Sequence, residues 1–335
     1  MINHPTPPSF RNKGIRGQSF SSQLAVWGLS LLFLHCSRPV PEAPAPGAPA
    51  PRETIILGWS VSSLNNEFFV TMKQGIEDAA KEQGITLLQA NANADVAKQV
   101  ADVEDLLQKG VAVMLITPQD SEAIVPAVKR CNDKGVPVVV VDIGAAGGKI
   151  AALIISDNYQ GGRLAGEFIA EKVGPQGKVV HIQCQLGAAN AQKRGQGFKD
   201  VMAEKGIAVV AEQPADSMKD KGMTVMENIL QAEAKIDAVF CQNDNMALGA
   251  LLAAKNAGRL KEMVIVGFDG NREAMNALAL GDLAATVTQN PYQMGRAGVE
   301  TAVKLVQGDK VPAVIKVPVS LVNSETAKSL HQVPE

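Results

Sequence analysis

The chain of 335 residues has few of the residues that enzymes and metal proteins use for chemistry. Its four histidines, at positions 4, 35, 181 and 331, include no pair at the spacing of a metal site or a catalytic triad. Its four cysteines, at positions 36, 131, 184 and 241, include no C-x-x-C pair, which argues against a disulfide scaffold or a zinc site. The last three cysteines lie in or beside apolar runs, so we predict that they pack as small core residues.

Motifs for phosphate binding and acyl transfer are also absent. No G-x-G-x-x-G follows the first predicted strand, and the chain has neither a G-x-x-x-x-G-K-[ST] loop nor a G-x-S-x-G elbow. Gly195-Gln196-Gly197 has no third glycine in register, and we interpret it as the start of a helix. His181 falls inside a strand pattern and is predicted to be a core residue. We therefore expect no catalytic residue, no metal and no cofactor.

Charge of one sign is not concentrated anywhere in the sequence. The formal net charge is −2, the pI is near 6.1, and lysines and arginines are scattered rather than clustered. A nucleic-acid-binding protein would be expected to show a basic patch or stripe. We therefore expect no nucleic acid partner.

The first 36 residues have the layout of an export signal. A basic stretch, with charges at positions 11, 13 and 16, precedes the apolar run Leu24–Leu34. A run of this length is too short for a comfortable membrane span and suits the apolar core of a signal peptide. We predict that residues 1–36 are an export signal. The rest of the chain would then work in the periplasm or on the outer face of the cytoplasmic membrane.

Cys36 is a candidate for lipidation, because it follows the apolar run where a lipoprotein signal places its acylated cysteine. Phe33 and His35 depart from the leucine and the small residue that are usual at those positions. Residues 37–53 are rich in proline and alanine, and chain of this composition is extended and stiff. We predict that they form a tether between a membrane anchor and a folded body.

From Thr54 onward, short apolar runs alternate with longer amphipathic patterns. The predicted strands are 55–61, 85–90, 112–117, 137–142, 150–156, 178–183, 207–212, 238–241 and 264–268. The predicted helices are 69–83, 94–109, 121–134, 161–173, 191–205, 219–231 and 246–256. Most strand runs are rich in Val and Ile without alternation, as in strands covered on both faces. This pattern predicts an α/β chain with two similar doubly wound parallel sheets.

Polar residues end or directly follow several of these strands. Thr117 and Asp142 end two of them, and Asn243 and Asp269 come just after two others. The carboxyl ends of parallel strands converge on one edge of a sheet, where ligands bind. Asn and Asp also cap helices, so for each single residue capping and ligand binding stay open as alternatives. For the group as a whole, ligand binding is favoured.

The segment Ser62–Phe69 adds amides, hydroxyls and two phenyl rings between the first strand and the first helix. An amide offers donors and an acceptor to a hydroxyl, and a phenyl ring covers the apolar face of a sugar. The alternative is that Phe68 and Phe69 are core residues of the helix. Because successive helical positions point about 100° apart, that alternative cannot hold equally for both rings.

Several separated segments resemble the periplasmic sugar-binding proteins of ABC importers, and among these the ribose binders. The segments are Leu64–Val70, Ser156–Asn158, Arg194–Phe198, Gln213–Asp216, Gln242–Ala250, Gly267–Gly270 and Ala284–Gln289. The resemblance covers Thr54 to about Asn323 and implies the type 1 periplasmic binding protein fold, with two lobes joined by a three-segment hinge. Lobe 1 would comprise residues 54–156 plus 289–317, and lobe 2 would comprise residues 157–288 plus 318–330.

The resemblance also implies which residues bind the ligand. The sugar contacts of the family fall on Asn66, Phe68, Phe69, Asp142, Arg194, Asn243, Asp269 and Gln289. Carboxylates accept from sugar hydroxyls, arginine donates in a planar fork, and amides do both. Where ribose binders carry a second arginine and a third stacking phenylalanine, this chain has Ile143 and Ser217. We therefore expect a ligand other than ribose: a bulkier or differently hydroxylated sugar, a polyol or a deoxy sugar.

The function implied by the resemblance is that of an extracytoplasmic solute-binding protein, not an enzyme. It would act as a monomer, capture a sugar-like ligand between closing lobes and deliver it to an ABC permease in the inner membrane. The alternative is a sensory role, with a chemoreceptor or sensor kinase as partner or a furanone-like signal as ligand. Repressors that share the fold need an N-terminal helix-turn-helix, and this chain has a signal and a tether instead. A sugar-processing enzyme is the remaining alternative, which turnover of a bound sugar would establish.

Overall fold

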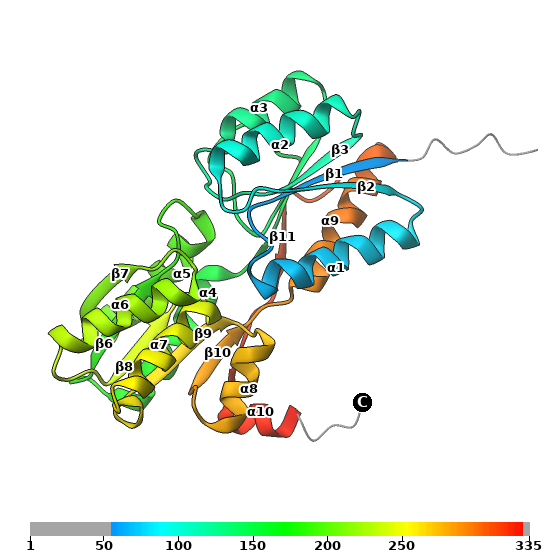
Figure 1. Ribbon diagram of the computed structural model, residues 1–335. Coiled ribbons are helices and arrows are strands. Elements are labelled where there is room, and N and C mark those ends of the chain that lie inside the picture. Colours follow the sequence, from blue (N-terminus) through cyan, green and yellow to red (C-terminus); the bar gives the residue numbers. More distant parts are fainter. Residues whose placement is uncertain (1–54, 331–335) are drawn as a thin grey trace, which may run out of the picture. The chain divides into compact units, whose positions relative to one another are not determined.

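The structure, a computed structural model, describes residues 55–330 (Figure 1). The predicted export signal at 1–36, with its lipidation candidate Cys36, and the predicted tether at 37–53 lie outside the described residues. Within residues 55–330, no helix combines the length and the apolar character that crossing a bilayer requires.

The first sheet consists of six parallel strands in the order β2-β1-β3-β4-β5-β11. Helices α1 and α9 cover one of its faces, and α2 and α3 cover the other (Figure 1). We call this sheet with its four helices lobe 1. Its strands are β1 (Ile56–Val61), β2 (Thr86–Asn91), β3 (Val113–Thr117), β4 (Val138–Val141), β5 (Ala152–Ser156) and β11 (Val314–Val317). Its helices are α1 (Glu67–Glu82), α2 (Val96–Gln108), α3 (Val125–Asp133) and α9 (Pro291–Val306).

Apolar runs without alternation form these strands because both faces of the sheet are buried. Val113 and Leu115 of β3 belong to the core under α1 and α9. Met114 and Ile116, between and after them, pack under α2 and α3. Since successive strand residues point to opposite faces, one continuous apolar run supplies two cores.

The second sheet has the order β7-β6-β8-β9-β10-β12, and only its edge strand β12 runs antiparallel to its neighbour. Helices α4 and α5 pack on one face, and α6, α7, α8 and α10 share the core of the other. We call this unit lobe 2. Its strands are β6 (Lys178–Gln183), β7 (Ala208–Pro214), β8 (Ala238–Cys241), β9 (Val264–Asp269), β10 (Ala285–Thr288) and β12 (Ser320–Asn323). Its helices are α4 (Asn158–Val173), α5 (Ala189–Lys205), α6 (Lys219–Ala232), α7 (Asp244–Asn256), α8 (Arg272–Leu280) and α10 (Ser324–Leu330), with a 3₁₀ turn at Leu260–Glu262.

The chain passes between the two sheets three times. Asp157 joins β5 to α4, residues 289–290 join β10 to α9, and residues 318–319 join β11 to β12. The predicted fold class, two doubly wound α/β lobes joined by three segments, is confirmed.

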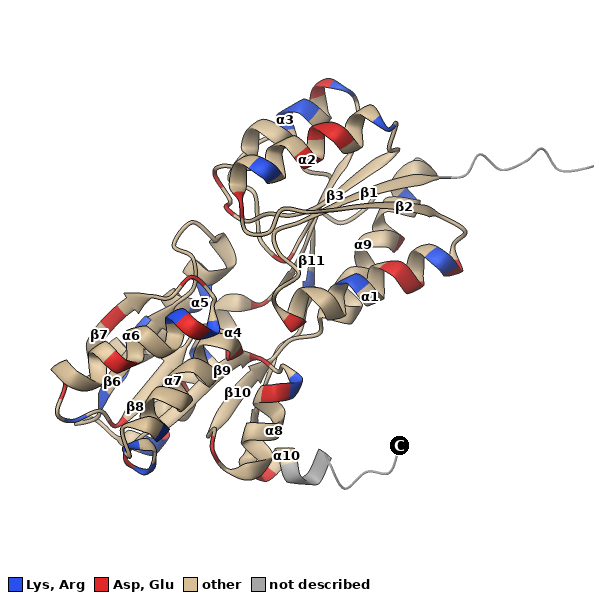
Figure 2. Ribbon diagram, in the orientation of Figure 1, with Lys and Arg blue, Asp and Glu red and all other residues tan. Residues whose placement is uncertain are grey.

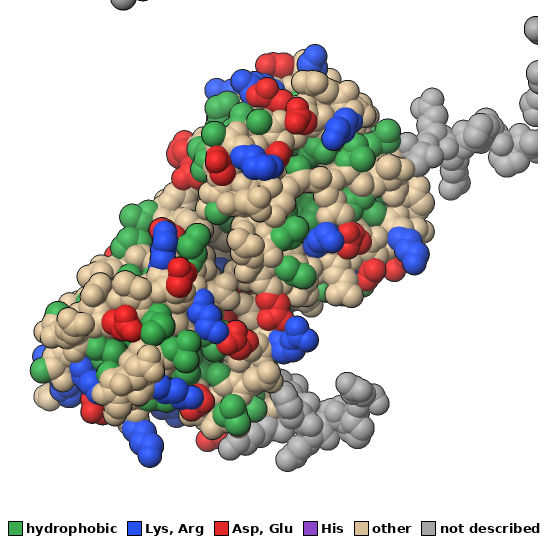
Figure 3. All heavy atoms as spheres, viewed as in Figure 1, with side chains coloured by type: hydrophobic (Ala, Val, Ile, Leu, Met, Phe, Trp, Pro, Cys, Tyr) green, Lys and Arg blue, Asp and Glu red, His purple; other side chains and the backbone are tan. Residues whose placement is uncertain are grey.

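Basic and acidic residues are interspersed along the helices of both lobes (Figure 2). The face seen in Figure 3 likewise mixes basic and acidic groups. Several of them form ion pairs between neighbouring helices, such as Arg163 with Glu204 at 2.8 Å and Arg296 with Glu82 at 2.6 Å. This mixing agrees with the scattered charges of the sequence.

The residues predicted to be core residues are buried. Cys131, Cys184 and Cys241 are free thiols in the core, and His181 is fully buried and packs against the rings of Phe198 and Phe240. Burial raises the pKa of the Cys184 thiol to about 11 and that of Cys131 to about 12, so these thiols stay protonated and unreactive at neutral pH.

The interpretation of Gly195-Gln196-Gly197 as the start of a helix is wrong. Helix α5 begins at Ala189, and the glycines lie in its middle. A Cβ on Gly197 would collide with the backbone of Tyr159 in α4, and one on Gly162 of α4 would collide with the carbonyl of Arg194. The glycines therefore serve close packing of α4 against α5, which fixes the helical turn that carries Arg194.

Gly162→Ala should destabilise the protein by about 1–3 kcal/mol, because the added Cβ meets rigid backbone. Gly298→Ala in α9 is the matched control. There a Cβ would meet side chains of Val141 and Leu115 at 3.4 and 3.5 Å, which is ordinary contact, and alanine favours a helix by up to about 1 kcal/mol. Urea unfolding followed by circular dichroism measures both variants. Equal stability of the two would contradict backbone contact between α4 and α5.

Candidate functional site

A cavity of about 540 Å³ is lined by residues of both lobes. The structure brings all ten predicted ligand-binding residues to its wall: Asn66, Phe68, Phe69, Asp142, Ile143, Arg194, Ser217, Asn243, Asp269 and Gln289. They come from segments far apart in the sequence, most of them at the carboxyl ends of strands in the two sheets. The face of the molecule shown in Figure 3 is hollowed near its middle.

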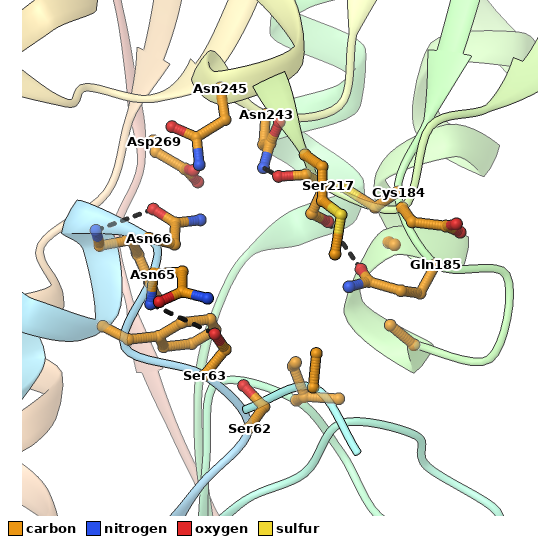
Figure 4. Close-up of a pocket in the computed structure, with 18 of the residues that line it drawn as sticks. Ser62, Ser63, Asn65, Asn66, Cys184, Gln185, Ser217, Asn243, Asn245 and Asp269 are labelled. Carbon is orange, nitrogen blue, oxygen red and sulfur yellow. Dashed lines mark hydrogen bonds between the residues drawn. The ribbon is translucent and has the colours of Figure 1, made fainter. Parts of the chain in front are cut away.

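The loop after β1 and the start of α1 supply the lobe 1 wall. Asn66 is the N-cap of α1, and its Oδ1 accepts from the Phe68 backbone N–H at 2.9 Å. Its Nδ2 is left pointing toward the cavity (Figure 4). Phe68 belongs to the lobe 1 core, whereas Phe69 is half-buried and packs edge-on against it, with ring centroids 5.3 Å apart. The two rings are thus unequally buried, as helical geometry requires.

Asp142 follows β4 directly and points into the cavity wall with 3% of its surface exposed. Its Oδ2 accepts from Asn190 Nδ2 of α5 at 3.2 Å, a hydrogen bond from lobe 2 to lobe 1. Its Oδ1 has no hydrogen-bond partner among the described residues. A buried carboxylate oxygen without a partner costs free energy, which a hydroxyl donated by a ligand would recover.

Thr117 also ends a strand, yet it does not line this cavity. Its Oγ1 accepts from Trp59 Nε1 at 3.3 Å and contacts the Met72 sulfur at 3.8 Å. The expectation that polar strand ends converge therefore fails at Thr117, because its side chain turns to the core face of β3.

Arg194 is a buried residue, 3% exposed, and its guanidinium is fixed by several contacts. Its Nε and Nη2 donate to Asn158 Oδ1 at 3.2 and 2.8 Å, and its Nη1 donates to the Gln242 carbonyl. The guanidinium lies 3.5 Å from the centroid of the Phe268 ring, a cation–π contact. These contacts keep a positive charge fixed at the cavity wall.

Asp269, at the end of β9, is the second buried carboxylate of the site. Its Oδ1 accepts from Gln289 Nε2 at 2.8 Å, while the Gln289 Oε1 is buried without a partner in the described structure. The Gln289 backbone N–H also donates to the Asp269 carbonyl, at 3.0 Å. Gln289 lies in the crossing between β10 and α9, so one of the three connections is tied to the site.

Asn243 combines the two roles that the sequence left open. Its Oδ1 caps α7 by accepting from the Met246 backbone N–H at 2.9 Å. Its Nδ2 donates to the Ser217 carbonyl at 3.2 Å, and the side chain lines the cavity. Capping and a place at the site are therefore compatible for this residue.

The buried carboxyls hold their protons more tightly than usual. Burial raises the pKa of Asp142 from its ordinary 3.8 to about 6, while the charge of Arg194 and the hydrogen bond from Asn190 lower it in part. Burial likewise raises the pKa of Asp269 well above its ordinary value, against the opposing charge of Arg194.

Backbone strain is concentrated at the cavity. Within residues 55–330, six residues other than glycine have positive φ, and all six line this cavity: Asn93, Ala94, Asp142, Asp216, Ser217 and Asp269. Such conformations are disfavoured for residues with a Cβ and cluster at functional sites. Their coincidence favours this cavity as the candidate functional site within the described residues.

Ile143 lines the cavity and packs against the opposite lobe. It is 7% exposed and packs into the core cluster of lobe 2 with Ala188 and Ala191, although it follows a strand of lobe 1. Further contacts between the lobes lie nearby. The Ser121 backbone N–H donates to the Gly187 carbonyl at 3.0 Å, and the Ser121 Oγ accepts from Ala189 N–H at 3.0 Å.

Ser62, Ser63 and Asn65, from the segment singled out in the sequence, also line the cavity. The sequence analysis missed other polar residues of its wall, among them Gln119, Gln185, Asn190 and Asn245. Gln185 and Asn190 come from the loop after β6 and the first turn of α5. The rule that points to carboxyl ends of strands could have found this loop. Placing the start of α5 at 191 left Asn190 unassigned.

Known proteins resemble this chain in sequence and in structure. A family model described as "Periplasmic binding protein domain" matches residues 57–310. The ribose import binding protein RbsB of Bacillus subtilis (strain 168) is 43% identical over 294 residues, covering 88% of this chain and 95% of that protein. A solute binding protein of an ABC transporter from Bacillus halodurans C-125, solved with bound myo-inositol, has a TM-score of 0.79 and 29% identity, covering 83% of this chain and 97% of that one. A periplasmic solute binding protein of an ABC transporter from Actinobacillus succinogenes 130z, solved with bound D-allose, has a TM-score of 0.77 and 30% identity, covering 82% of this chain and 100% of that one.

The raised pKa of Asp142 predicts a loss of stability with rising pH. The folded state keeps this proton up to about pH 6, whereas the unfolded chain releases it near 3.8. The contribution to stability is therefore complete below pH 3.8 and is lost as the pH rises through 6, by about 3 kcal/mol. Asp142→Asn cannot titrate, so its free energy of unfolding relative to the unaltered protein should rise by most of that amount between pH 4 and 7.5. Urea unfolding at several pH values measures the difference, and a constant difference would contradict the burial of this carboxyl.

Proposed function

The chain belongs to the periplasmic binding protein family, and we propose that it captures a sugar or polyol between its two lobes outside the cytoplasm and delivers it to an ABC permease. The relatives described above are binding proteins and not enzymes. The observation that supports the ligand class is the cavity itself, with two buried carboxyls, a fixed guanidinium, several amides and a phenyl ring. We propose that all ten predicted residues contact the ligand or shape its site.

The chemistry of the wall suits vicinal hydroxyls. The unpartnered Oδ1 of Asp142 and Oε1 of Gln289 accept, and the Nδ2 of Asn66 donates. The half-buried ring of Phe69 offers an apolar surface to the C–H face of a ring. A ligand without the matching hydroxyls would leave buried polar groups unpaired, so the site should reject it strongly.

Ligand binding should close the lobes, because each lobe carries only part of the site. Asn66, Phe69 and Asp142 belong to lobe 1, whereas Arg194, Asn243 and Asp269 belong to lobe 2. A ligand that touches both sets favours the state in which both are within reach. We propose that the three crossings, at 157, 289–290 and 318–319, form the hinge.

A sensory role and a lipid anchor remain predictions. Cys36, the candidate for lipidation, lies outside the described residues. The names of the relatives reported above refer to import and transport, so a chemoreceptor or sensor kinase partner has no support from them. The monomeric state is likewise a prediction.

Asp269→Asn should abolish ligand binding while the protein stays folded, because it replaces a buried acceptor without changing volume. A thermal-shift panel of D-ribose, D-allose, other hexoses, deoxy sugars and myo-inositol measures this. A ligand at a thousandfold excess over its Kd stabilises by about 4 kcal/mol, or roughly 8 °C or more.

The matched control is Asp309→Asn, which changes an exposed aspartate outside the cavity and should keep the full shift. An Asp269→Asn variant that still shows the full shift would contradict the site assignment. A panel in which no sugar or polyol shifts the melting temperature would contradict the proposed function.

A further inference from the structure

A polar pair forms part of the lobe 2 wall where the resemblance leads one to expect a phenyl ring. Ser217 Oγ donates to Gln185 Oε1 at 2.6 Å, and both side chains line the cavity. Figure 4 shows the two side chains facing each other across this hydrogen bond at the edge of the cavity. Both residues are half-buried, so a ligand can reach them.

The backbone holds this pair in place. Ser217 has a φ of 63°, a conformation that costs free energy for a residue with a Cβ. Its carbonyl accepts from Asn243 Nδ2 at 3.2 Å, and the next residue, Met218, donates its N–H to the Ala215 carbonyl at 3.0 Å. On the other side, the Gln185 carbonyl accepts from the Ala188 N–H at 3.1 Å. A strained turn fixed from two sides positions the Ser217 hydroxyl rather than leaving it to rotate into solvent.

The hydrogen bond between the two side chains leaves an acceptor free on Ser217 and donors free on Gln185. The Ser217 hydroxyl donates its single proton to Gln185 Oε1, and its oxygen can still accept a hydrogen bond. Gln185 Nε2 has two protons to donate and makes no hydrogen bond within the described part of the chain that involves them. A single hydroxyl that donates to Ser217 and accepts from Gln185 would close a ring of three hydrogen bonds. The hydrogen bonds of such a ring strengthen one another in a partly buried site.

We propose that Gln185 and Ser217 form a subsite for a hydroxymethyl arm, so that the ligand is a hexose-like ring rather than a pentose. The inference rests on the proposed function, since it assigns a part of the same ligand. The ring itself lies against Asp142, Asp269 and Phe69, and the arm extends toward the polar pair.

Ile143, the other position that differs from ribose binders, leaves no room for the hydroxymethyl arm. Ile143 is packed into the lobe 2 core, and Asn190 takes up one oxygen of Asp142 beside it. Asp216, next to Ser217, is paired with Lys221 at 2.7 Å, so its charge is already balanced at the rim. The hydroxyl at 217 and the amide at 185 thus keep hydrogen-bonding capacity that a ligand can use.

D-ribose, D-allose and 6-deoxy-D-allose share one configuration of ring hydroxyls, so comparing them distinguishes the contribution of the arm from that of the ring. D-allopyranose carries the hydroxyl configuration of D-ribopyranose and adds a hydroxymethyl group at C5, and 6-deoxy-D-allose keeps the added carbon but loses its hydroxyl. Isothermal titration of the mature protein with each sugar gives the dissociation constants. We expect the dissociation constant of D-allose to be lower by about tenfold or more than those of D-ribose and 6-deoxy-D-allose, because only D-allose gains the paired hydrogen bonds.

Gln185→Leu removes the amide at similar volume and should lower the allose-to-ribose affinity ratio about tenfold. Ser217→Ala should lower it in the same direction. Gln108→Leu, a matched change at an exposed position of α2, should leave the ratio unchanged.

The outcomes distinguish the subsite from the proposed function. If D-allose binds no tighter than D-ribose, or 6-deoxy-D-allose binds as tightly as D-allose, the subsite is overturned and sugar binding still stands. A ratio that Gln185→Leu does not move would likewise overturn the subsite. If none of the three sugars binds and the wider panel is silent, the proposed function itself fails.

Discussion

Two buried carboxyls that face a fixed guanidinium are the constraint on which the site depends. Asp142 and Asp269 are almost fully buried, and each has raised pKa because its hydrogen bonds and the charge of Arg194 offset burial only in part. Such an arrangement is costly in the free protein and favourable once hydroxyls supply the missing partners. The chemistry of this cavity therefore suits the polyhydroxylated ligand that we propose.

The fold supplies what this arrangement needs. Parallel strands bring Asp142 and Asp269 to the sheet edges that border the cavity, and close packing of α4 on α5 fixes the turn that holds Arg194. Strained backbone at six cavity residues shows that local stability is given up where the side chains must point inward. Contacts such as Asn190 with Asp142 then link the two half-sites.

Hydrophobic periodicity predicted the strands and helices up to β9 to within a few residues, because long buried runs leave a clear pattern. It assigned no element after β9, so α8, β10, α9, β11, β12 and α10 were left out. β11 and β12 leave little pattern, since these are four-residue strands with partly exposed residues. Residues of the site were reached by resemblance, not by pattern alone. Gln185 lies in the loop after β6, which the rule about strand ends could have found, and Asn190 was missed because the helix was predicted to begin at 191. Thr117 was grouped with the polar strand ends of the site because a pattern does not tell which face of a strand end meets the cavity.

We propose that the ligand bridges two half-sites and thereby moves the lobes. The direct test is energy transfer between dyes on Asp105→Cys in lobe 1 and Asn228→Cys in lobe 2, two exposed positions outside the cavity. The native cysteines among the described residues are buried and should not be labelled. We expect the sugar with the largest thermal shift to change the transfer efficiency, and Asp269→Asn to remove the change. Binding that stabilises the protein without any change in transfer efficiency would contradict this proposal.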